Sequence, residues 1–438
     1  MHYIFRNTRY IDVIRGEVIE HRDIEIEDGK IKAIEGSNTL SGGEVIDGSN
    51  LLLVPGFVNA HTHLGMSYFR NYADDMDLNT WLTTAIWPLE AHLTGDDIYW
   101  ASLLSMAEGI MSGTTTFCDM YYEMDRVADA ALDIGMRGLL TRGLTDIDGQ
   151  GEEKLEEVRM LYANCHGKGN GRLQVAPAPH AIYTCSGKYI KEIIGLAKEM
   201  DGIIHVHASE TEKEVEDSLN EYKKTPVEYM CDLGLNDVHT IAAHCVHMRE
   251  EEMDMVDSDK FFPVYNPSSN LKLASGFAPI KEFLDKGFKV ALGTDGDSSN
   301  NNQNMLEEMH IASIVNKAVT MDPEAVSAKE VLRMATINGA EALGRADEIG
   351  SIEVGKRADI ACFNLNTSSF TPLNNLISAL CYSAQAEDVE HVLIDGEFVL
   401  RNRKFTRLNL DDVRENVERK FGELLERKAL NDEMNLEN

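Results

Sequence analysis

Eight short apolar runs, separated by helical or mixed segments, constrain the fold of this chain more than any other feature. They lie near residues 57–61, 114–118, 136–141, 173–177, 203–207, 239–243, 261–265 and 289–294. Strands that alternate with helices form parallel sheets, and eight such units predict an α/β fold of the closed (β/α)8 TIM-type barrel class. Active sites of these barrels lie at the carboxyl ends of the strands. We therefore expect functional side chains directly after the apolar runs.

Segments with short strand-like runs joined by turns flank the predicted barrel. Residues 1–55 contain short strand-like runs with Asp-Gly hairpin signals at 28–29 and 47–48. Strand-like runs return at 355–363 and 393–399, and the apolar spacing over 411–428 predicts an amphipathic helix. We expect the flanks, 1–55 and 355–438, to pair into one small β-sandwich domain beside a barrel of residues 56–354.

The charge balance argues against two classes of partner. The 438 residues include 74 Asp+Glu and 41 Lys+Arg, a formal net charge of −33. Such a surface repels nucleic-acid phosphates and anionic membranes at long range, so we expect a small-molecule partner, with no nucleic acid and no membrane. The acidity fits either a solvated surface, which we favour, or an acidic interaction surface.

Cysteine usage and hydropathy bear on the compartment. The seven cysteines stand singly, with no Cys-x-x-Cys pair, which is typical of a reducing compartment rather than of a disulfide framework. Residues 1–7 lack the apolar region of a signal peptide, and no stretch approaches the roughly 18 apolar residues of a membrane span. We therefore expect a soluble cytoplasmic protein.

Histidines and acids follow five of the predicted strands. The first strand ends in His61-Thr62-His63, and residues two apart on a strand point the same way. The others are His180 after the fourth strand, His207 and Glu210 after the fifth, His244 after the sixth and Asp295 after the eighth. Singly, the histidines also fit satisfied core residues, and the aspartate fits a turn or a helix cap. Their common place at strand ends favours one shared site.

The residue types at these strand ends indicate a metal centre. His61, His63 and His207 offer nitrogen ligands and Asp295 an oxygen ligand, which suits one divalent ion per subunit, zinc first and iron or manganese as alternatives. Bound Zn²⁺ lowers the pKa of its water to about 7, so hydrolysis is the expected reaction class.

Two further residues are candidates for proton chemistry. Glu210 lies too far along its loop to be an equivalent ligand and is placed for proton transfer to the substrate. His244 is expected to orient the attacking water or polarise the bond under attack, together with Asp295. A binuclear site bridged by a carboxylated lysine is not expected, because no lysine ends the fourth strand.

Motifs around these residues make the chain similar to the amidohydrolase superfamily. They are Pro-Gly-Phe-Val-Asn-Ala-His-Thr-His (55–63), Gly-Thr-Thr-Thr (113–116), His-Val-His-Ala-Ser-Glu (205–210), Ala-His-Cys (243–245) and Gly-Thr-Asp-Gly (293–296). Within the superfamily, Trp-Pro-Leu-Glu (87–90) and Asn-Pro-Ser-Ser-Asn-Leu-Lys-Leu-Ala (266–274) resemble the deaminases of methylthioadenosine, S-adenosylhomocysteine and 5'-deoxyadenosine.

The resemblance implies three substrate contacts. Glu90 would bind the ribose 2'- and 3'-hydroxyls, His180 the adenine ring, and Arg142 the region of the 5' substituent. From the residues alone, Pro88 and Glu90 also fit the first turn of a helix for structural reasons. Arg142 also fits a surface ion pair.

One departure from the family pattern concerns the 5' substituent. Relatives that bind a homocysteine carboxylate commonly use a second arginine in the segment where this chain has Lys154 among acids. This difference favours a small 5' group, methyl or methylthio. Trp81 and Met66 fit either packing against such a group or the ordinary core.

The resemblance predicts a hydrolytic deaminase that converts 5'-modified adenosines, and adenosine as a further candidate, to inosine derivatives and ammonia, in salvage of S-adenosylmethionine by-products. Alternatives are a guanine or cytosine deaminase, a triazine hydrolase and a non-enzymatic barrel scaffold. The nucleic-acid-editing zinc deaminases do not fit, because the Pro-Cys-x-x-Cys part of their signature is absent. The resemblance also leads us to expect a homo-oligomer, with a tetramer favoured.

Overall fold

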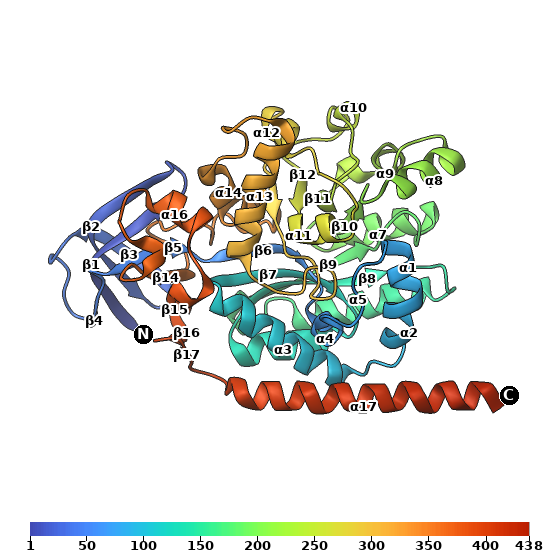
Figure 1. Ribbon diagram of the computed structural model, residues 1–438, viewed down its shortest axis with the longest axis horizontal. Helices are drawn as coiled ribbons and strands as arrows, with labels where there is room; N and C mark the ends of the chain where they lie inside the picture. Colours follow the sequence, from blue (N-terminus) through green and yellow to red (C-terminus); the bar gives the residue numbers. More distant parts are fainter. Residues whose placement is uncertain (438) are drawn as a thin grey trace.

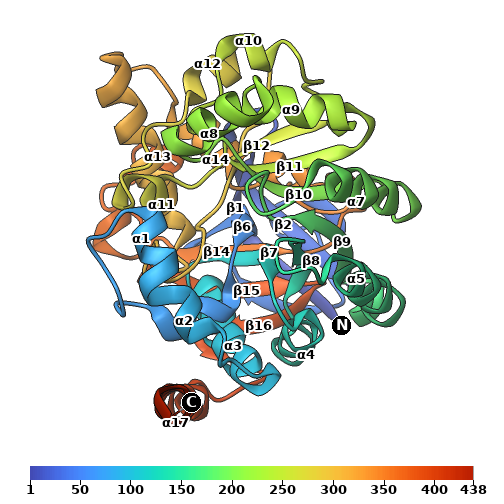
Figure 2. The ribbon, with the colours of Figure 1, turned by 90° about the vertical axis from the view of Figure 1, so that its right-hand side faces the viewer.

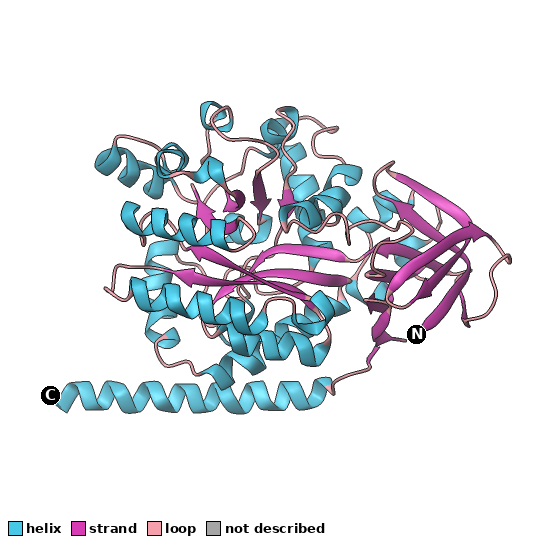
Figure 3. Cartoon of the chain, turned by 180° about the vertical axis from the view of Figure 1, so that it is seen from behind, coloured by secondary structure: helices cyan, strands magenta, loops and turns pink. Residues whose placement is uncertain are grey.

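The computed structural model describes residues 1–437, with the side chains described up to residue 433. Figure 1 shows a β domain at one end, a larger body of strands and helices, and a long carboxyl-terminal helix along its side. Figure 3 shows from behind that strands dominate the β domain and that helices cover the body.

All eight predicted strands of the barrel are present. They are β6 (Phe57–Thr62), β7 (Thr114–Tyr121), β8 (Arg137–Leu144), β9 (Leu173–Pro179), β10 (Ile203–Ala208), β11 (His239–His244), β12 (Phe261–Tyr265) and β13 (Ala291–Leu292). Each pairs in parallel with its neighbour in two sheets of order β6-β7-β8-β9 and β10-β11-β12-β13. Figure 2 shows these strands in the centre, with helices around them.

The hydrogen-bonded ladders stop at two places, so one closed eight-stranded ladder is not observed. Between β9 and β10, Pro177 and Pro179 lack the N–H groups that a ladder needs. Between β13 and β6, the strand β13 has only two residues. Single backbone hydrogen bonds nonetheless link the sheets at both places, from His207 N to His180 O (3.1 Å) and from Asp295 N to His61 O (3.0 Å).

Helices follow the strands of the body. The longer ones are α3 (Gly95–Met111), α4 (Met124–Ile134), α5 (Gly151–Cys165), α7 (Gly187–Glu199), α8 (Glu212–Tyr222), α9 (Pro226–Leu233), α13 (Met305–Thr320) and α14 (Ala328–Met334). Shorter pieces are η1 (Leu64–Phe69), α1 (Leu78–Trp81), η2 (Leu82–Ile86), α2 (Trp87–Glu90), α6 (Lys168–Gly171), η3 (Leu235–Asp237), α10 (Glu250–Met253), α11 (Pro267–Lys272), α12 (Ile280–Asp285) and α15 (Ile337–Ala342). Sequence signals define their ends. In α3, for example, the Thr94 side chain accepts a hydrogen bond from Asp97 N in a capping box.

Both flanks of the chain build one nine-stranded sheet, as predicted for a shared β domain. Its order is β17-β16-β15-β14-β5-β1-β2-β3, with β4 paired to β1. The bounds are β1 (His2–Asp12), β2 (Glu17–Glu27), β3 (Lys30–Gly36), β4 (Glu44–Asp47), β5 (Leu51–Pro55), β14 (Ile360–Asn364), β15 (Val389–Ile394), β16 (Glu397–Arg401) and β17 (Lys404–Phe405). The antiparallel pair β5–β14 joins the two flanks. Folding of this sheet into a sandwich stays a prediction.

One of the two predicted hairpins is present. Asp28 and Gly29 both have positive φ (51° and 81°), as a tight turn between β2 and β3 requires. The hairpin predicted at Asp47-Gly48 is wrong, because β4 and β5 both run parallel to β1. Gly48 instead allows a close approach, since a Cβ atom there would lie 2.5 Å from Thr8 Cβ.

A buried ion-pair network joins the β domain to the body. Arg137 at the start of β8 is fully buried and donates to Asp359 (2.7 and 3.0 Å) and to Asp395 (2.6 Å). Arg172 also donates to Asp395 (2.8 Å). Both aspartates lie in the carboxyl-terminal flank, so charge pairing fixes the β domain against the barrel.

The carboxyl-terminal flank also contains η4 (Ser368–Phe370), α16 (Leu376–Tyr382), η5 (Ala386–Asp388) and α17 (Leu410–Glu437). The helix predicted over 411–428 is therefore confirmed and extends further. Val413 and Leu424 of α17 are buried, and Arg427 binds Asp97 of α3 and His92 O. Among the described residues, no helix is long and apolar enough to cross a membrane.

Candidate active site

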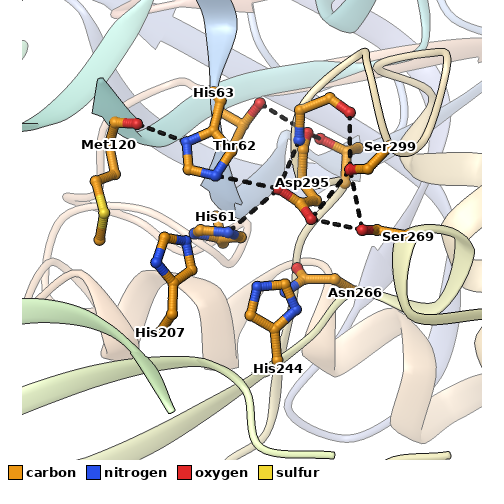
Figure 4. A network of polar contacts seen from close by, with 12 residues as sticks. His61, Thr62, His63, Met120, His207, His244, Asn266, Ser269, Asp295 and Ser299 are labelled. Atoms are coloured by element: carbon orange, nitrogen blue, oxygen red, sulfur yellow. Dashed lines mark hydrogen bonds and ion pairs between the residues drawn. The ribbon is translucent and has the colours of Figure 1, made fainter. Parts of the chain in front are cut away.

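Three predicted ligands from two distant parts of the sequence meet at the ends of β6 and β13. Asp295 Oδ1 lies 3.2 Å from His63 Nε2 and 3.5 Å from His61 Nε2. The two imidazole rings stand edge to face, with centroids 4.9 Å apart. Figure 4 shows the three side chains pointing toward one centre. The structure therefore brings these residues together, as their strand-end positions predicted.

His207 of β10 and His244 of β11 complete the group. The centroids of their rings lie 5.0 and 5.3 Å from that of His61. Ligand atoms within 4.8 Å of one another form two overlapping sets, His61–His207–His244 and His61–His63–Asp295. We call these five residues the His–Asp cluster. All but His63 are buried, and the His63 side chain is 15% exposed.

Backbone carbonyl groups orient two of the histidines. His63 Nδ1 lies 2.5 Å from Met120 O, and His207 Nδ1 lies 2.9 Å from His180 O. A carbonyl oxygen only accepts, so the proton of each neutral ring is on Nδ1 and the Nε2 lone pair is free. Only one nitrogen of His207 is therefore occupied in this way, which separates it from an ordinary satisfied core histidine.

The backbone around Asp295 is held in an unusual conformation. Asp295 has a φ of 63°, in the left-handed region that costs energy for a residue with a side chain. Gly296 N donates to its Oδ1 (2.7 Å) and Ser269 Oγ to its Oδ2 (2.6 Å). Gly293 allows the approach to β6, because a Cβ atom there would lie 2.8 Å from His61 O. The carboxylate is thus fixed before anything binds.

The His–Asp cluster fits a divalent metal ion. The Nε2 atom of His61 is buried and has no hydrogen-bond partner among the described residues, a costly arrangement for a polar atom. Burial opposes ionisation of Asp295, but the nearby side chains of His61 and His63 hold its pKa well below the usual range. Neutral imidazoles and a carboxylate are the donor set that zinc and similar ions prefer.

Glu210 lies next to this cluster, as predicted. Its side chain is buried, and its Oε2 is 3.8 Å from His244 Nε2. Burial, together with the charges of Asp295 and Glu214, raises the pKa of Glu210 well above its usual range. Glu214 accepts a hydrogen bond from the backbone N of Glu210 (2.7 Å), which fixes the loop. Burial therefore favours the protonated form of Glu210.

Two asparagines contact His244, and our reading of the sequence assigned them no role. The Asn270 amide lies 2.8 Å from His244 Nδ1, and the Asn266 amide lies 3.3 Å from the same atom. Both belong to the 266–274 motif, so the motif itself was the available signal. Burial lowers the pKa of His244 to about 3, which keeps the ring neutral.

A pocket opens from the cluster toward the solvent. Its wall combines the polar cluster with apolar side chains, including the predicted Met66 and Trp81, which are both buried. Also lining it are His63, Leu78, Leu82, Trp87, Glu90, Met120, Tyr121, Tyr122, Gly143, Thr145, His180, Tyr183, His207, Glu210, His244, Leu273, Asp295 and Ser299. Polar groups at one end and apolar walls beyond them are typical of a small-molecule site.

Glu90 and His180 both line this pocket, and each has a partner that orients it. Tyr121 at the end of β7 donates to Glu90 Oε1 (2.5 Å), and His180 Nδ1 lies 2.9 Å from Thr184 Oγ1. Burial raises the pKa of Glu90 and lowers that of His180 to about 4. Tyr121 was not predicted from the sequence, because its contact joins the end of β7 to the separate helix α2.

Arg142 and Lys154 are less directly placed. Arg142 lines a neighbouring cavity that it shares with Glu90 and His180, and it pairs with Glu157 (2.9 Å). The Lys154 ammonium group does not line the inner pocket and instead binds Thr145 and Asp148 (2.6 Å). The ion-pair alternative for Arg142 therefore holds in this structure, and neither cation lines the inner pocket.

A family model and two named relatives match most of this chain. The family model described as "Amidohydrolase family" matches residues 52–399. A protein of Thermoanaerobacter pseudethanolicus named 5-methylthioadenosine/S-adenosylhomocysteine deaminase is 49% identical, over 98% of this chain and 100% of that protein. A protein of Methanothermobacter thermautotrophicus named 5'-deoxyadenosine deaminase is 44% identical, over 93% and 95%.

A solved structure also matches nearly the whole chain. A crystal structure of an adenosine deaminase from Xanthomonas campestris, described as having bound zinc, superposes with a TM-score of 0.92. The two sequences are 31% identical, and the match covers 96% of this chain and 98% of that one.

Proposed function

The chain belongs to the amidohydrolase family, and from this membership we propose that it is a metal-dependent hydrolytic deaminase of 5'-modified adenosines. The reaction replaces the 6-amino group of the purine with oxygen and gives the matching inosine derivative and ammonia. One observation carries the proposal: a single pocket is lined by four residues of the His–Asp cluster, by Glu210 and by Glu90.

His61, His63, His207 and Asp295 are the residues that would hold the metal ion. Zinc is the first candidate, supported by the zinc described for the Xanthomonas relative, with iron and manganese as alternatives. When bound, the ion supplies a water molecule that is acidic near neutral pH and a positive charge beside the reacting carbon.

Glu210 acts as the proton donor in this proposal. Its raised pKa favours the protonated carboxyl group, which delivers its proton to the ring nitrogen next to C6 as the C6–O bond forms. His244 and Asp295 orient the attacking water and accept its proton. That proton passes through Glu210 to the departing amino group, the C6–N bond breaks, and ammonia leaves. The proton of the C6 hydroxyl group returns to Glu210 as the C6=O group of the product forms.

Substrate orientation follows from Glu90 and His180. A carboxylate accepts hydrogen bonds from two adjacent hydroxyl groups, so Glu90 suits the ribose, while His180 lies beside the reactive end and suits the purine. A free base or a triazine lacks the ribose hydroxyls and leaves Glu90 unpaired. Glu90 therefore argues against both alternative substrate classes.

The region of the 5' substituent favours small groups. Arg142 is paired with Glu157, and Lys154 with Asp148, so both nearby cations are already neutralised. The cavity that Arg142 shares with Glu90 also contains Glu123 and Asp148. We expect 5'-deoxyadenosine and methylthioadenosine to be preferred over S-adenosylhomocysteine, in salvage of S-adenosylmethionine by-products.

We also propose that the two four-stranded sheets act as one closed barrel. The hydrogen bonds from His207 N to His180 O and from Asp295 N to His61 O bridge the two gaps. Both bridges involve cluster residues, so closure and site geometry depend on each other.

The test is the rate of ammonia release by the zinc-loaded protein. The substrates are 5'-deoxyadenosine, methylthioadenosine, S-adenosylhomocysteine, adenosine, adenine, guanine and cytosine. We expect turnover of the nucleosides only, and a loss of about 10²–10⁴ in kcat for Glu210→Gln. Glu212→Gln, an exposed glutamate two residues away, is the matched control. Turnover of a free base but of no nucleoside would overturn the proposal.

A further inference from the structure

We propose that His205 is a positioning residue that fixes the tautomer of His61 and thereby strengthens metal binding. This inference rests on the proposed metal site and names a residue beyond its ligands. His205 lies in β10, two residues before His207, and is fully buried. Residues two apart on a strand point the same way, so His205 lies one layer deeper in the barrel than His207.

A chain of three hydrogen bonds leads from His61 into the barrel. His61 Nδ1 lies 2.8 Å from His205 Nε2, and the rings stand edge to face with centroids 4.9 Å apart. His205 Nδ1 lies 3.0 Å from Thr141 Oγ1. Thr141 Oγ1 lies 2.7 Å from Asp119 O. Every side chain in this chain is inaccessible to solvent.

The end of the chain decides where each proton lies. Asp119 O is a carbonyl oxygen and only accepts, so it takes the hydroxyl proton of Thr141. Thr141 Oγ1 must then accept from His205 Nδ1–H. A neutral His205 consequently has a bare Nε2, which accepts from His61 Nδ1–H. The remaining nitrogen, His61 Nε2, is left with its lone pair directed at the cluster.

The reverse arrangement is unfavourable. His205 Nδ1 also lies 3.4 Å from Cys118 Sγ, and a thiol donating to this nitrogen would reverse the tautomer. It would also place two lone pairs, on Thr141 Oγ1 and His205 Nδ1, face to face at 3.0 Å. A doubly protonated His205 would be a buried charge without a carboxylate in this chain of contacts, which costs more than either neutral form.

His61 differs in this respect from the other two proposed histidine ligands. His63 and His207 are oriented by the backbone carbonyls of Met120 and His180, which substitution cannot remove. Only His61 depends on a side chain. Partners of this kind orient the ligand ring, and their loss typically weakens metal binding about 10- to 100-fold.

The experiment measures zinc transfer from the zinc-loaded, full-length protein to a chromophoric chelator at equilibrium. His205→Met removes the acceptor, and we expect zinc to bind about 10- to 100-fold more weakly. His205→Gln keeps an oxygen acceptor near the position of Nε2 and is expected to restore most of the affinity. Thr141→Val, which frees the His205 tautomer, should give an intermediate loss, and its matched control Thr141→Ser none.

The outcomes separate the inference from the function on which it rests. Wild-type affinity in both His205→Met and Thr141→Val would overturn the role of His205 alone. Equal weakening in His205→Gln and His205→Met would also overturn it, because shape and not hydrogen bonding would then matter. A wild-type protein that takes up no divalent metal would overturn the proposed function as well. If His205→Met does not fold, the Thr141 pair decides the question.

Discussion

Tyr121 donates a hydrogen bond of 2.5 Å to Glu90 Oε1, and the two side chains lie together in the wall of the pocket. Burial and the charge of Glu90 raise the pKa of Tyr121 well above 10, so the hydroxyl group keeps its proton and always donates. One oxygen of Glu90 is thereby occupied. In the proposed function, the other oxygen accepts hydrogen bonds from the two hydroxyl groups of the ribose.

The first prediction is that Tyr121→Phe weakens binding of nucleosides more than it slows their reaction. Without its partner, Glu90 loses both its orientation and a hydrogen bond to a charged group, worth about 1.5–3 kcal/mol. We expect KM for 5'-deoxyadenosine to rise about tenfold or more, with kcat little changed. Steady-state ammonia release over a range of substrate concentrations measures both.

Tyr99→Phe is the control for this change, because Tyr99 donates a similar bond to Asp133 (2.7 Å) outside the pocket. It should leave KM unaltered. A fall in kcat at constant KM in Tyr121→Phe would contradict a role in ribose binding.

The second prediction concerns the 5' substituent and follows from the ion pair of Arg142 with Glu157. Glu157→Gln frees the guanidinium at the cavity beside Glu90, where it can meet a carboxylate on a longer substrate. We expect the ratio of kcat/KM for S-adenosylhomocysteine to that for 5'-deoxyadenosine to rise about fivefold to tenfold. Glu153→Gln, exposed on the same helix, should leave the ratio as it was. An unchanged ratio in Glu157→Gln would mean that Arg142 does not reach the 5' group.

Local patterns predicted the strands and the cluster because each depends on few neighbours in sequence. The apolar runs located all eight barrel strands, and the strand-end rule placed His61, His207 and Asp295 in one site. Tyr121 and Asn270 were not predicted because their contacts depend on how separate helices and strands pack together. His205 was visible in the His-x-His motif, but only the contact with Thr141 gives it a role.

The β domain shows the same limit. Two Asp-Gly pairs in the amino-terminal flank look alike in sequence, yet only the pair at 28–29 forms a hairpin. At Asp47-Gly48 the chain continues along β1, because β4 and β5 both find their partner there. Turn chemistry permits a reversal, and long-range pairing decides whether it occurs.

The third prediction is that Arg137→Met destabilises the fold strongly. The substitution leaves Asp359 and Asp395 buried and short of a cation, which typically costs about 3–5 kcal/mol. Arg126→Met breaks a partly exposed pair with Asp129 and should cost less than about 1 kcal/mol. Urea denaturation followed by circular dichroism measures both free energies of unfolding. Equal small losses would show that other cations compensate at the domain junction.

The fourth prediction concerns pH and the buried Glu308, whose burial raises its pKa to about 8. Glu308 accepts hydrogen bonds from Ser268 and from Asn300 (2.8 Å), and it thus links α11 to the loop that follows Asp295. In the unfolded chain a glutamate titrates near about 4.3. Between these two values the folded protein holds a proton that the unfolded chain lacks. The free energy of unfolding therefore falls as pH rises through this range, by up to about 1.4 kcal/mol per pH unit.

Glu308→Gln removes this titration, so its stability relative to the wild type should increase steadily from pH 5 to pH 8. Urea denaturation at three pH values in that range measures the difference, in which pH effects common to both proteins cancel. Glu307→Gln is the control, because this exposed neighbour meets similar surroundings in the folded and unfolded chain and its difference should stay flat. A constant difference for Glu308→Gln as well would mean that its carboxyl group is ionised in the folded protein. The hydrogen bonds from Ser268 and Asn300 would then outweigh the cost of burial.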